Sequence, residues 1–402
     1  MILKKKAEKS LVYVLLFAFW GCTQALLPDA LRAQVKFDFH GFVNPHYYAD
    51  SRAVVGGRED MMLFFPKPIA PDSTGNDKNE GWQANMMAIT ARLGVRISGP
   101  DVLGARTSAY VEGDFTGSTN ATINDLRLRH AYINMEWERH KLLVGQYWYP
   151  MQIHEVLPMT NPLNMGAPFA LYARYNQVRY QTQMGAIQMV AAASWQLDNM
   201  SQGLLDGTHT SSTAFARHSM IPELTLQVRY AGEKLFFGGA ANLRSIQPQV
   251  PWTSLNKRLH HMASYTLFAK ATAGQLTVKA QTLLNNSLYE GCSLGGYMML
   301  TDGDVADWHF NTVWMDLSRN AGRWRPGLFL GYAKNSQWGD YEGASHLFGR
   351  GQDLEYLWRV QPRLTFKASQ TLFFTAEAEY TRAGYAEAVG NLRLSLTMQY
   401  DF

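Results

Sequence analysis

Cysteine is nearly absent from this chain, which has two cysteines among 402 residues. Cys22 lies in an N-terminal apolar stretch that we expect to be removed, which leaves Cys292 alone. An internal disulfide is then excluded, so the fold cannot depend on the cross-links that stabilise small exported domains. We expect Cys292 to be an inert loop residue.

Long hydrophobic segments are also missing after the N-terminal stretch. Hydrophobic residues make up 47% of the chain and aromatic residues 13%, but charged residues only 17%. No second stretch stays apolar over the length that a membrane-crossing helix needs. The apolar residues are instead dispersed by alternation, which is how transmembrane β-barrels escape a hydropathy search.

Positive charge is in excess only near the N-terminus. The formal net charge is +4, and the first 34 residues hold much of the excess. They carry Lys4, Lys5, Lys6, Lys9 and Arg32 against Glu8 and Asp29. The remaining chain is close to neutral and has no basic patch, so we expect no nucleic-acid partner.

Signatures of enzymes and cofactor sites are weak or missing. His154-Glu155 has no second ligand at metal spacing, and His260-His261 lies at the end of a loop. The sequence T-D-G-D at 301–304 resembles part of a calcium loop but lacks the later glutamate. No G-x-S-x-G element is present. We therefore expect no catalysis, no metal and no cofactor.

The N-terminus has the layout of an export signal. Residues 1–9 carry four lysines, an apolar run follows from 11 to about 27, and Pro28-Asp29 ends it. We predict a signal peptide over 1–34, cleaved near Ala33 or Gln34. A retained membrane helix is one alternative. A lipoprotein signal ending at Gly21-Cys22 is another, although Phe19 and Trp20 fit that pattern poorly.

The segment 390–402 shows the clearest strand pattern. Six apolar residues alternate with six polar ones, and the last residue, Phe402, is aromatic. Strand side chains point alternately to opposite faces, so one face of this strand is apolar and the other polar. A soluble sandwich is an alternative. A strand that ends the chain on an aromatic residue instead favours the closing strand of an outer-membrane barrel, with an apolar exterior and a water-filled interior.

The same alternation continues through residues 35–402, where we predict a transmembrane antiparallel β-barrel of about sixteen strands. A different count by one hairpin, 14 or 18, is the alternative. Short turns and long loops alternate between the strands, as two different membrane sides require. Near His130 the parity slips, which predicts a β-bulge. The predicted strands cover 35–50, 87–98, 105–115, 125–137, 141–149, 175–182, 186–196, 221–231, 235–246, 261–273, 275–285, 307–317, 325–335, 353–368, 371–383 and 390–402.

One connection, 150–174, differs from the other loops because it combines prolines with many apolar residues. A loop in water would not need these apolar side chains, so we predict that it folds back into the barrel as a constriction loop. The candidate residues of this loop are Pro150, His154, Glu155, Pro158, Asn161 and Asn164.

Charges on the polar parity would line an aqueous channel in a barrel of this size. The basic set is larger than the acidic set, which favours a mild anion preference. The alternative is that these charges solvate the wall and pair with one another. Arg92, Arg96 and Arg106 are expected to be adjacent across one hairpin. The basic candidates are Arg92, Arg96, Arg106, Arg127, Arg129, Arg179, Arg229, Lys270, Lys279, Arg359 and Arg393, and the acidic ones are Glu112, Asp114, Glu355, Glu377, Glu379 and Asp401.

Aromatic residues cluster at predicted strand ends, as in Tyr147-Trp148-Tyr149 and Phe373-Phe374. Strand ends are where interfacial girdles of barrels lie. Platforms on which sugars stack are the alternative interpretation.

Five segments resemble, in order and spacing, a run of strands in the phosphate-selective porin O/P superfamily, including its DcaP-like trimeric porins. They read A-R-L-G-V-R (91–96), Y-V-E-G-D-F-T-G (110–117), L-R-L-R-H-A-Y (126–132), L-V-G-Q (143–146) and Q-V-R-Y (177–180). The resemblance implies a sixteen-stranded, trimeric, passive channel whose third outer loop enters the lumen. The chain lacks the dense basic ladder of strict phosphate pores, so a broader preference for small polar or anionic solutes is expected.

Two functions fit the sequence. The first is an outer-membrane porin in contact with membrane lipid, through which small polar or anionic solutes diffuse passively. The second is a structural or surface-binding barrel with a plugged lumen, whose loops 51–82 and 197–218 dock a partner.

Overall fold

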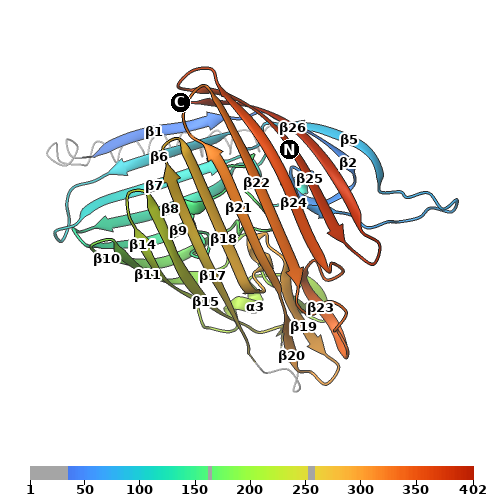
Figure 1. Ribbon diagram of the computed structural model, residues 1–402. Coiled ribbons are helices and arrows are strands. Elements are labelled where there is room, and N and C mark those ends of the chain that lie inside the picture. Colours follow the sequence, from blue (N-terminus) through green and yellow to red (C-terminus); the bar gives the residue numbers. More distant parts are fainter. Residues whose placement is uncertain (1–34, 162–164, 252–258) are drawn as a thin grey trace, which may run out of the picture.

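A closed antiparallel β-barrel of sixteen strands forms the whole described structure, as predicted (Figure 1). The computed structural model describes residues 35–161, 165–251 and 259–402. The predicted signal peptide, 1–34, and Asn164 lie outside these residues. None of the helices in the described ranges has the length and apolarity needed to cross a membrane.

The wall consists of eighteen segments, because the first two strands are each interrupted once. In order around the barrel these are β1 (Lys36–Val43) with β2 (His46–Arg52), β5 (Glu80–Met87) with β6 (Arg92–Ser98), β7 (Arg106–Asp114), β8 (Arg127–Glu136), β9 (His140–Trp148), β10 (Arg174–Met184), β11 (Ile187–Trp195), β14 (Glu223–Ala231), β15 (Leu235–Ile246), β17 (His260–Ala273), β18 (Leu276–Asn286), β21 (Phe310–Arg319), β22 (Trp324–Asn335), β24 (Tyr356–Lys367), β25 (Leu372–Gly384) and β26 (Val389–Asp401). The second strand begins at Glu80, in a stretch that the sequence pattern placed in a loop.

Short turns join the strands at one end of the barrel and long loops at the other. We call these the short-turn end and the long-loop end. The loops contain β3 (Val54–Gly57), β4 (Met62–Pro66), η1 (Asn120–Thr122), η2 (His154–Val156), β12 (Gln202–Leu205), β13 (Thr208–Ser211), α3 (Ala214–Arg217), β16 (Gln249–Val250), η3 (Tyr289–Gly291), β19 (Gly295–Leu300), β20 (Val305–Trp308) and β23 (Ala344–Arg350). Figure 1 shows β19, β20 and β23 extending beyond the wall at the long-loop end.

The last strand closes the barrel against the first. Gly41 and Phe402 exchange two backbone hydrogen bonds of 2.9 and 3.1 Å. A Cβ on Gly41 would lie 2.2 Å from the Arg92 carbonyl oxygen, so this close approach requires glycine. Pro45 interrupts the first strand because it has no N–H, yet its carbonyl still accepts a bond from Met398 N (3.1 Å).

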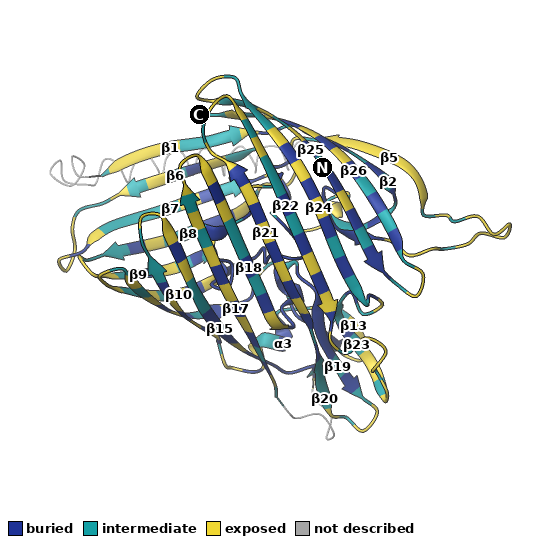
Figure 2. Cartoon of the chain, viewed as in Figure 1, coloured by how far each residue is buried: buried dark blue, intermediate teal, exposed yellow. Residues whose placement is uncertain are grey.

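Side chains alternate along the wall between buried and exposed positions, as the bands in Figure 2 show. In β26, Arg393 is 3% exposed and faces inward, whereas Leu396 is 59% exposed and faces outward. The outward apolar belt continues around the barrel on every long strand, far beyond the patch that a soluble monomer exposes. Such a surface fits the hydrocarbon of a membrane.

The predicted bulge near His130 is confirmed. The register of β7 against β8 shifts between Glu112 and Gly113, so that Glu112 pairs with His130 and Gly113 with Leu128. The extra residue, Arg129, points into the barrel together with His130, and both are buried. The bulge therefore adds a second inward side chain at this level of the wall.

A charge on the outward belt should destabilise the barrel. We expect Leu267→Arg, in the middle of β17, to lower the free energy of unfolding by about 2–4 kcal/mol, because the guanidinium meets hydrocarbon. Denaturant unfolding in phospholipid vesicles measures this loss. Leu267→Val is the matched control and should change little; equal effects of the two substitutions would contradict a lipid-facing belt.

Candidate functional site: the lumen and its two infolded segments

The predicted constriction loop does fold into the barrel. After leaving β9, the loop follows the inner wall past β14, β18 and β21 to β26, and Val156 and Phe169 are fully buried. Polar side chains of the wall fix its path at several places. These bonds are Lys279 Nζ to Leu157 O (2.7 Å), Met159 N to Asp316 Oδ2 (3.3 Å) and Asn161 Nδ2 to Ser395 Oγ (2.7 Å).

The candidate residues of this loop have different environments. Pro150 and Pro158 are buried, and the Pro150 carbonyl accepts a hydrogen bond from Gln227 Nε2. Asn161 is buried against the far wall. His154 and Glu155 instead border a cavity.

A second segment also enters the lumen, and the sequence analysis missed it. The hairpin of β3 and β4 comes from the connection 51–82, which we expected to be an outer loop. All five residues of β4 are buried. The available signal was the apolar run M-M-L-F-F at 61–65, which a polar outer loop would not need.

Arginines of the wall hold this hairpin by its backbone. Arg393 Nη1 donates to Met61 O at 3.0 Å, and Arg359 Nη2 donates to Phe64 O at 3.1 Å. Each guanidinium also has an acidic partner on a neighbouring strand. Arg393 lies 2.7 Å from Asp50, and Arg359 lies 3.0 Å from Glu379. These inward charges are thus neutralised and used as anchors.

The bulge residue Arg129 organises a further charged cluster. Its guanidinium bonds Glu112 at 2.6 Å and Asp114 at 2.7 Å. Arg127 pairs with Asp114 as well, at 3.0 Å. The hydroxyl of Tyr172, at the end of the constriction loop, accepts bonds from Arg129 and Arg174. The cluster therefore ties the returning end of the loop to β8 and β10.

The expected group of three adjacent arginines is not formed. In the register of β6 and β7, Arg92 lies opposite Asp114 and Arg96 opposite Tyr110. Arg106 is at the rim of the short-turn end, 3.5 Å from Glu136, with a 76% exposed side chain. The spacing of Arg106 matched the inward parity, but Arg106 is the first residue of β7 and so lies at the strand end beside the hairpin turn.

The other basic candidates differ in whether an acidic or amide side chain binds them. Arg229 binds Glu155 at 3.2 Å and also donates to Gln188 and Gln181. Lys270 faces Lys279 across β17 and β18. Arg179 is half-buried and lies over the Tyr147 ring, 5.8 Å from its centroid.

A cavity of about 470 Å³ lies toward the short-turn end, between the constriction loop and the wall from β6 to β14. Its volume is within the range of small-molecule sites. The lining is basic and aromatic, with two acidic groups. Its charged members are Arg96, Lys141, Arg179, Arg229, Glu136 and Glu155, and its large aromatic members are Tyr110, Tyr132, Tyr147 and Trp148.

A second cavity, of about 270 Å³, lies against the opposite wall of the same end. Met159 and Asn161 of the constriction loop border it, together with Arg325 of β22 and Asp401 of β26. The constriction loop thus has one cavity on each side. Among the described residues, no group of three or more His, Cys, Asp or Glu side chains is placed to hold a metal ion.

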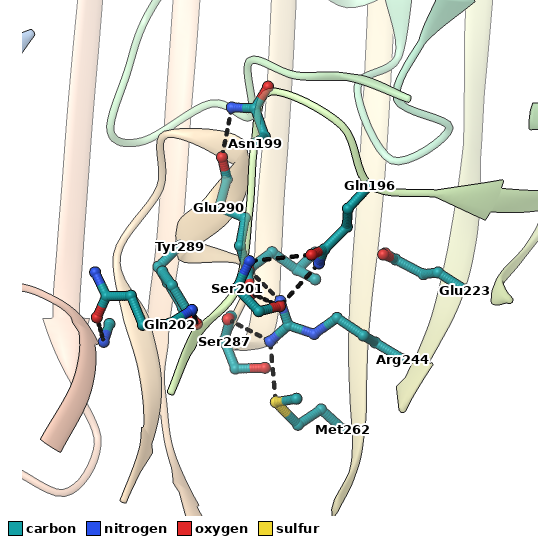
Figure 3. A network of polar contacts seen from close by, with 12 residues as sticks. Gln196, Asn199, Ser201, Gln202, Glu223, Arg244, Met262, Ser287, Tyr289 and Glu290 are labelled. Carbon is teal, nitrogen blue, oxygen red and sulfur yellow. Dashed lines mark hydrogen bonds and ion pairs between the residues drawn. The ribbon is translucent and has the colours of Figure 1, made fainter. Parts of the chain in front are cut away.

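The long-loop end is tied together by the polar network in Figure 3. Arg244 of β15 forms an ion pair with Glu290 of η3, and its Nη2 donates to Ser287 O at 3.0 Å. Ser201 Oγ donates to the other Glu290 oxygen at 2.7 Å, and Asn199 Nδ2 donates to the Glu290 carbonyl at 2.7 Å. Two loops, 196–202 and 287–291, are thereby fixed to one buried arginine.

A carboxylate between two histidines holds the β19–β20 hairpin to the wall. His260 Nε2 at the start of β17 lies 2.5 Å from Asp307 Oδ1, and His309 Nε2 lies 3.5 Å from Oδ2. Burial alone would raise the pKa of Asp307, but the hydrogen bonds from both histidines outweigh it and hold the pKa below its usual range.

The class that this fold defines is a closed antiparallel β-barrel with an infolded loop. No protein-family model and no curated protein matches the sequence. The fold is similar to the outer membrane channel DcaP of Acinetobacter baumannii, with a TM-score of 0.70 at 15% identity over 92% of this chain and 98% of that one.

Two further solved structures are similar over 92% of this chain and 100% of the other: the anion-selective porin from Comamonas acidovorans (TM-score 0.59, 11% identity) and the trimer form of OmpT from Vibrio cholerae (TM-score 0.55, 11% identity). At such identities the likeness establishes a porin-like fold alone.

Acid should release the β19–β20 hairpin. Because the folded-state pKa of Asp307 is depressed, its charge stabilises the hairpin above the ordinary carboxyl range, roughly pH 4, and this contribution is lost as the pH falls through the lower folded value. Hydrogen exchange of β20, corrected for the intrinsic rate, should accelerate in that window. Asp307→Asn should abolish the pH step and Asp340→Asn should keep it; a step that persists in Asp307→Asn would exclude this carboxylate as the cause.

Loosening one anchor should widen the channel. In Arg393→Lys the ammonium keeps its charge next to Asp50 but loses the planar fork that reaches the carbonyls of Asp60 and Met61, just before β4. The loss is roughly 1.5–3 kcal/mol per charged hydrogen bond. We expect a higher single-channel conductance in planar bilayers and faster proteolysis within 57–66. The matched control is Arg382→Lys on β25, outside the lumen. Wild-type conductance in folded Arg393→Lys would show that the hairpin does not limit the pore.

Proposed function

We propose that the chain is an outer-membrane porin for passive diffusion of small hydrophilic solutes. The observation that carries this proposal is a closed barrel with a polar inner wall, narrowed by an infolded loop that has a cavity on either side. A barrel of sixteen strands is wide enough for an aqueous channel. The likeness of the fold to solved outer-membrane channels supports the same function.

The proposed selectivity is a mild preference for anions. Arg96 and Arg179 line the larger cavity, and within the described ranges neither guanidinium has an ion-pair partner. Of the acidic groups there, Glu155 pairs with Arg229 and Glu136 with Arg106. The uncompensated charge is therefore positive, and low-dielectric walls strengthen its effect on passing ions.

Several companion proposals follow from the sequence. Residues 1–34 act as a cleaved signal peptide that directs the chain to the outer membrane, where the short-turn end faces the periplasm. The barrel contacts membrane lipid and assembles as a homotrimer. It acts as a channel and not as an enzyme, without cofactor or metal.

The alternative function, a surface-binding barrel with a plugged lumen, is favoured by one observation. The β3–β4 hairpin buries Phe64 and Phe65 inside the barrel, where they reduce the open cross-section. In that case the exposed loop residues 67–76, and not the whole of 51–82, would be available to a partner, together with 197–218.

The reversal potential in a salt gradient distinguishes the two functions. A porin of the proposed kind should give stable open channels and a reversal potential of the sign expected for anion preference. Replacing both Arg96 and Arg179 with Gln should move the reversal potential toward zero, because the unpaired positive charge of the cavity is removed.

The matched control is Arg382→Gln on the outward face of β25, which removes a positive charge outside the lumen. It should leave the reversal potential close to that of the wild type. Absence of stable conductance would count against the porin and favour the plugged barrel, whereas firm cation preference would contradict the proposed anion-preferring porin.

A further inference from the structure

The larger cavity has an aromatic wall built from three consecutive strands. Tyr132 on β8 lies between Tyr110 on β7 and Tyr147 on β9, with ring centroids 5.5 and 5.1 Å away. All three tyrosines line the cavity. An outward girdle would place these rings at the lipid interface, but here they face the lumen. Their faces offer apolar surface and their hydroxyls offer polar contacts to a solute.

Single atoms of buried amide groups at the same cavity lack hydrogen-bond partners. In the part of the chain that the structure describes, these are Gln152 Nε2, Gln227 Oε1 and Asn134 Oδ1. The three side chains are 3%, 2% and 7% exposed, and all three line the cavity. An unpaired buried polar atom is costly, and a solute or water that reaches it from the cavity would remove this cost.

The kind of unpaired atom restricts the solute. One of the three is a donor, but the other two are acceptors, which require an O–H or N–H group. Chloride or a bare carboxylate offers acceptors alone and would leave both oxygens unpaired, and the phosphate dianion, with its single O–H, would leave one of them unpaired. A solute with hydroxyl groups can satisfy donor and acceptors together.

The charge of the cavity restricts the solute further. Arg179 lies against the Tyr147 ring and has no acidic partner within the described ranges, and Lys141 and Arg96 are on the same lining. A guanidinium beside an aromatic face binds a carboxylate in a fixed orientation, because its donors are planar. The solute should therefore carry a negative group close to the part that contacts the tyrosine rings.

We propose that this cavity binds a sugar acid, a hydroxylated ring that carries one carboxylate, during passage through the channel. The ring lies against Tyr132 and Tyr147, its carboxylate is bound by Arg179, and its hydroxyls pair with the amides of Gln152, Gln227 and Asn134. The assignment names the solute class of the proposed porin and depends on that function for its transport role. The binding itself does not depend on conduction.

Isothermal titration of the purified full-length protein in detergent micelles tests the binding, with D-galacturonate as the probe. D-galactose has similar hydroxyls without the carboxylate, and propionate has the carboxylate without hydroxyls. We expect galacturonate to bind at least about tenfold more tightly than either, a difference of roughly 1.4 kcal/mol. Equal affinities, or no galacturonate binding, would overturn the proposal.

Variants separate the contributions of ring and charge. Arg179→Gln should weaken galacturonate binding and leave galactose binding unchanged. Tyr132→Leu should weaken both sugars, whereas Tyr132→Phe should retain wild-type affinity because it keeps the ring. Tyr230→Leu, on the outward face of β14, is the matched control and should have no effect. Unchanged galacturonate affinity in both folded Arg179→Gln and Tyr132→Leu would place the binding elsewhere and refute the site.

Planar-bilayer conductance of the same preparations keeps the two proposals distinguishable. Open channels without galacturonate binding would leave the porin intact and refute the sugar-acid site. Galacturonate binding that responds to the variants, in a protein without conductance, would support the site and refute the porin.

Discussion

A charge that the strand alternation turns into a buried part of this barrel must find a partner there, and much of the structure depends on this constraint. Desolvated guanidinium groups are costly unless ion-paired and hydrogen-bonded. Arg359 and Arg393 meet the requirement with an acid on a neighbouring strand and with backbone carbonyls of the β3–β4 hairpin. The wall and the hairpin therefore stabilise each other. Arginines of the wall donate hydrogen bonds, and backbone carbonyls of the hairpin accept them.

Under the same constraint, the two ends of the lumen differ in how far their inward charges are paired. Toward the long-loop end, the Arg129 cluster, the Arg244–Glu290 network and the anchored hairpin pair their charged groups with one another. Toward the short-turn end, neither Arg96 nor Arg179 forms an ion pair in the described ranges. Beside them, single atoms of buried amide groups lack hydrogen-bond partners. Uncompensated positive charge therefore lies beside unpaired amide atoms at this cavity.

The local pattern of the chain predicted the wall well and its charges less well. Unbroken alternation in 390–402 and similar segments predicted the sixteen strands, and the parity slip at His130 predicted the bulge that the β7–β8 register contains. The same parity argument treated Arg106 as a pore residue, yet the structure places it at the rim. Parity determines which face a side chain occupies, but its depth along the pore depends on strand tilt and register, which are properties of the closed sheet.

The sequence by itself determined the barrel, its apolar belt and the infolding of 150–174, because each follows from side-chain patterns within one segment. Tertiary structure alone decided which second segment enters the lumen. This hairpin comes from 51–82, and its partners Arg359 and Arg393 are roughly three hundred residues away along the chain. Contacts over such separations form because the ring closes and brings the first and last strands together. A period-two pattern contains no information about which distant carbonyl will meet which arginine.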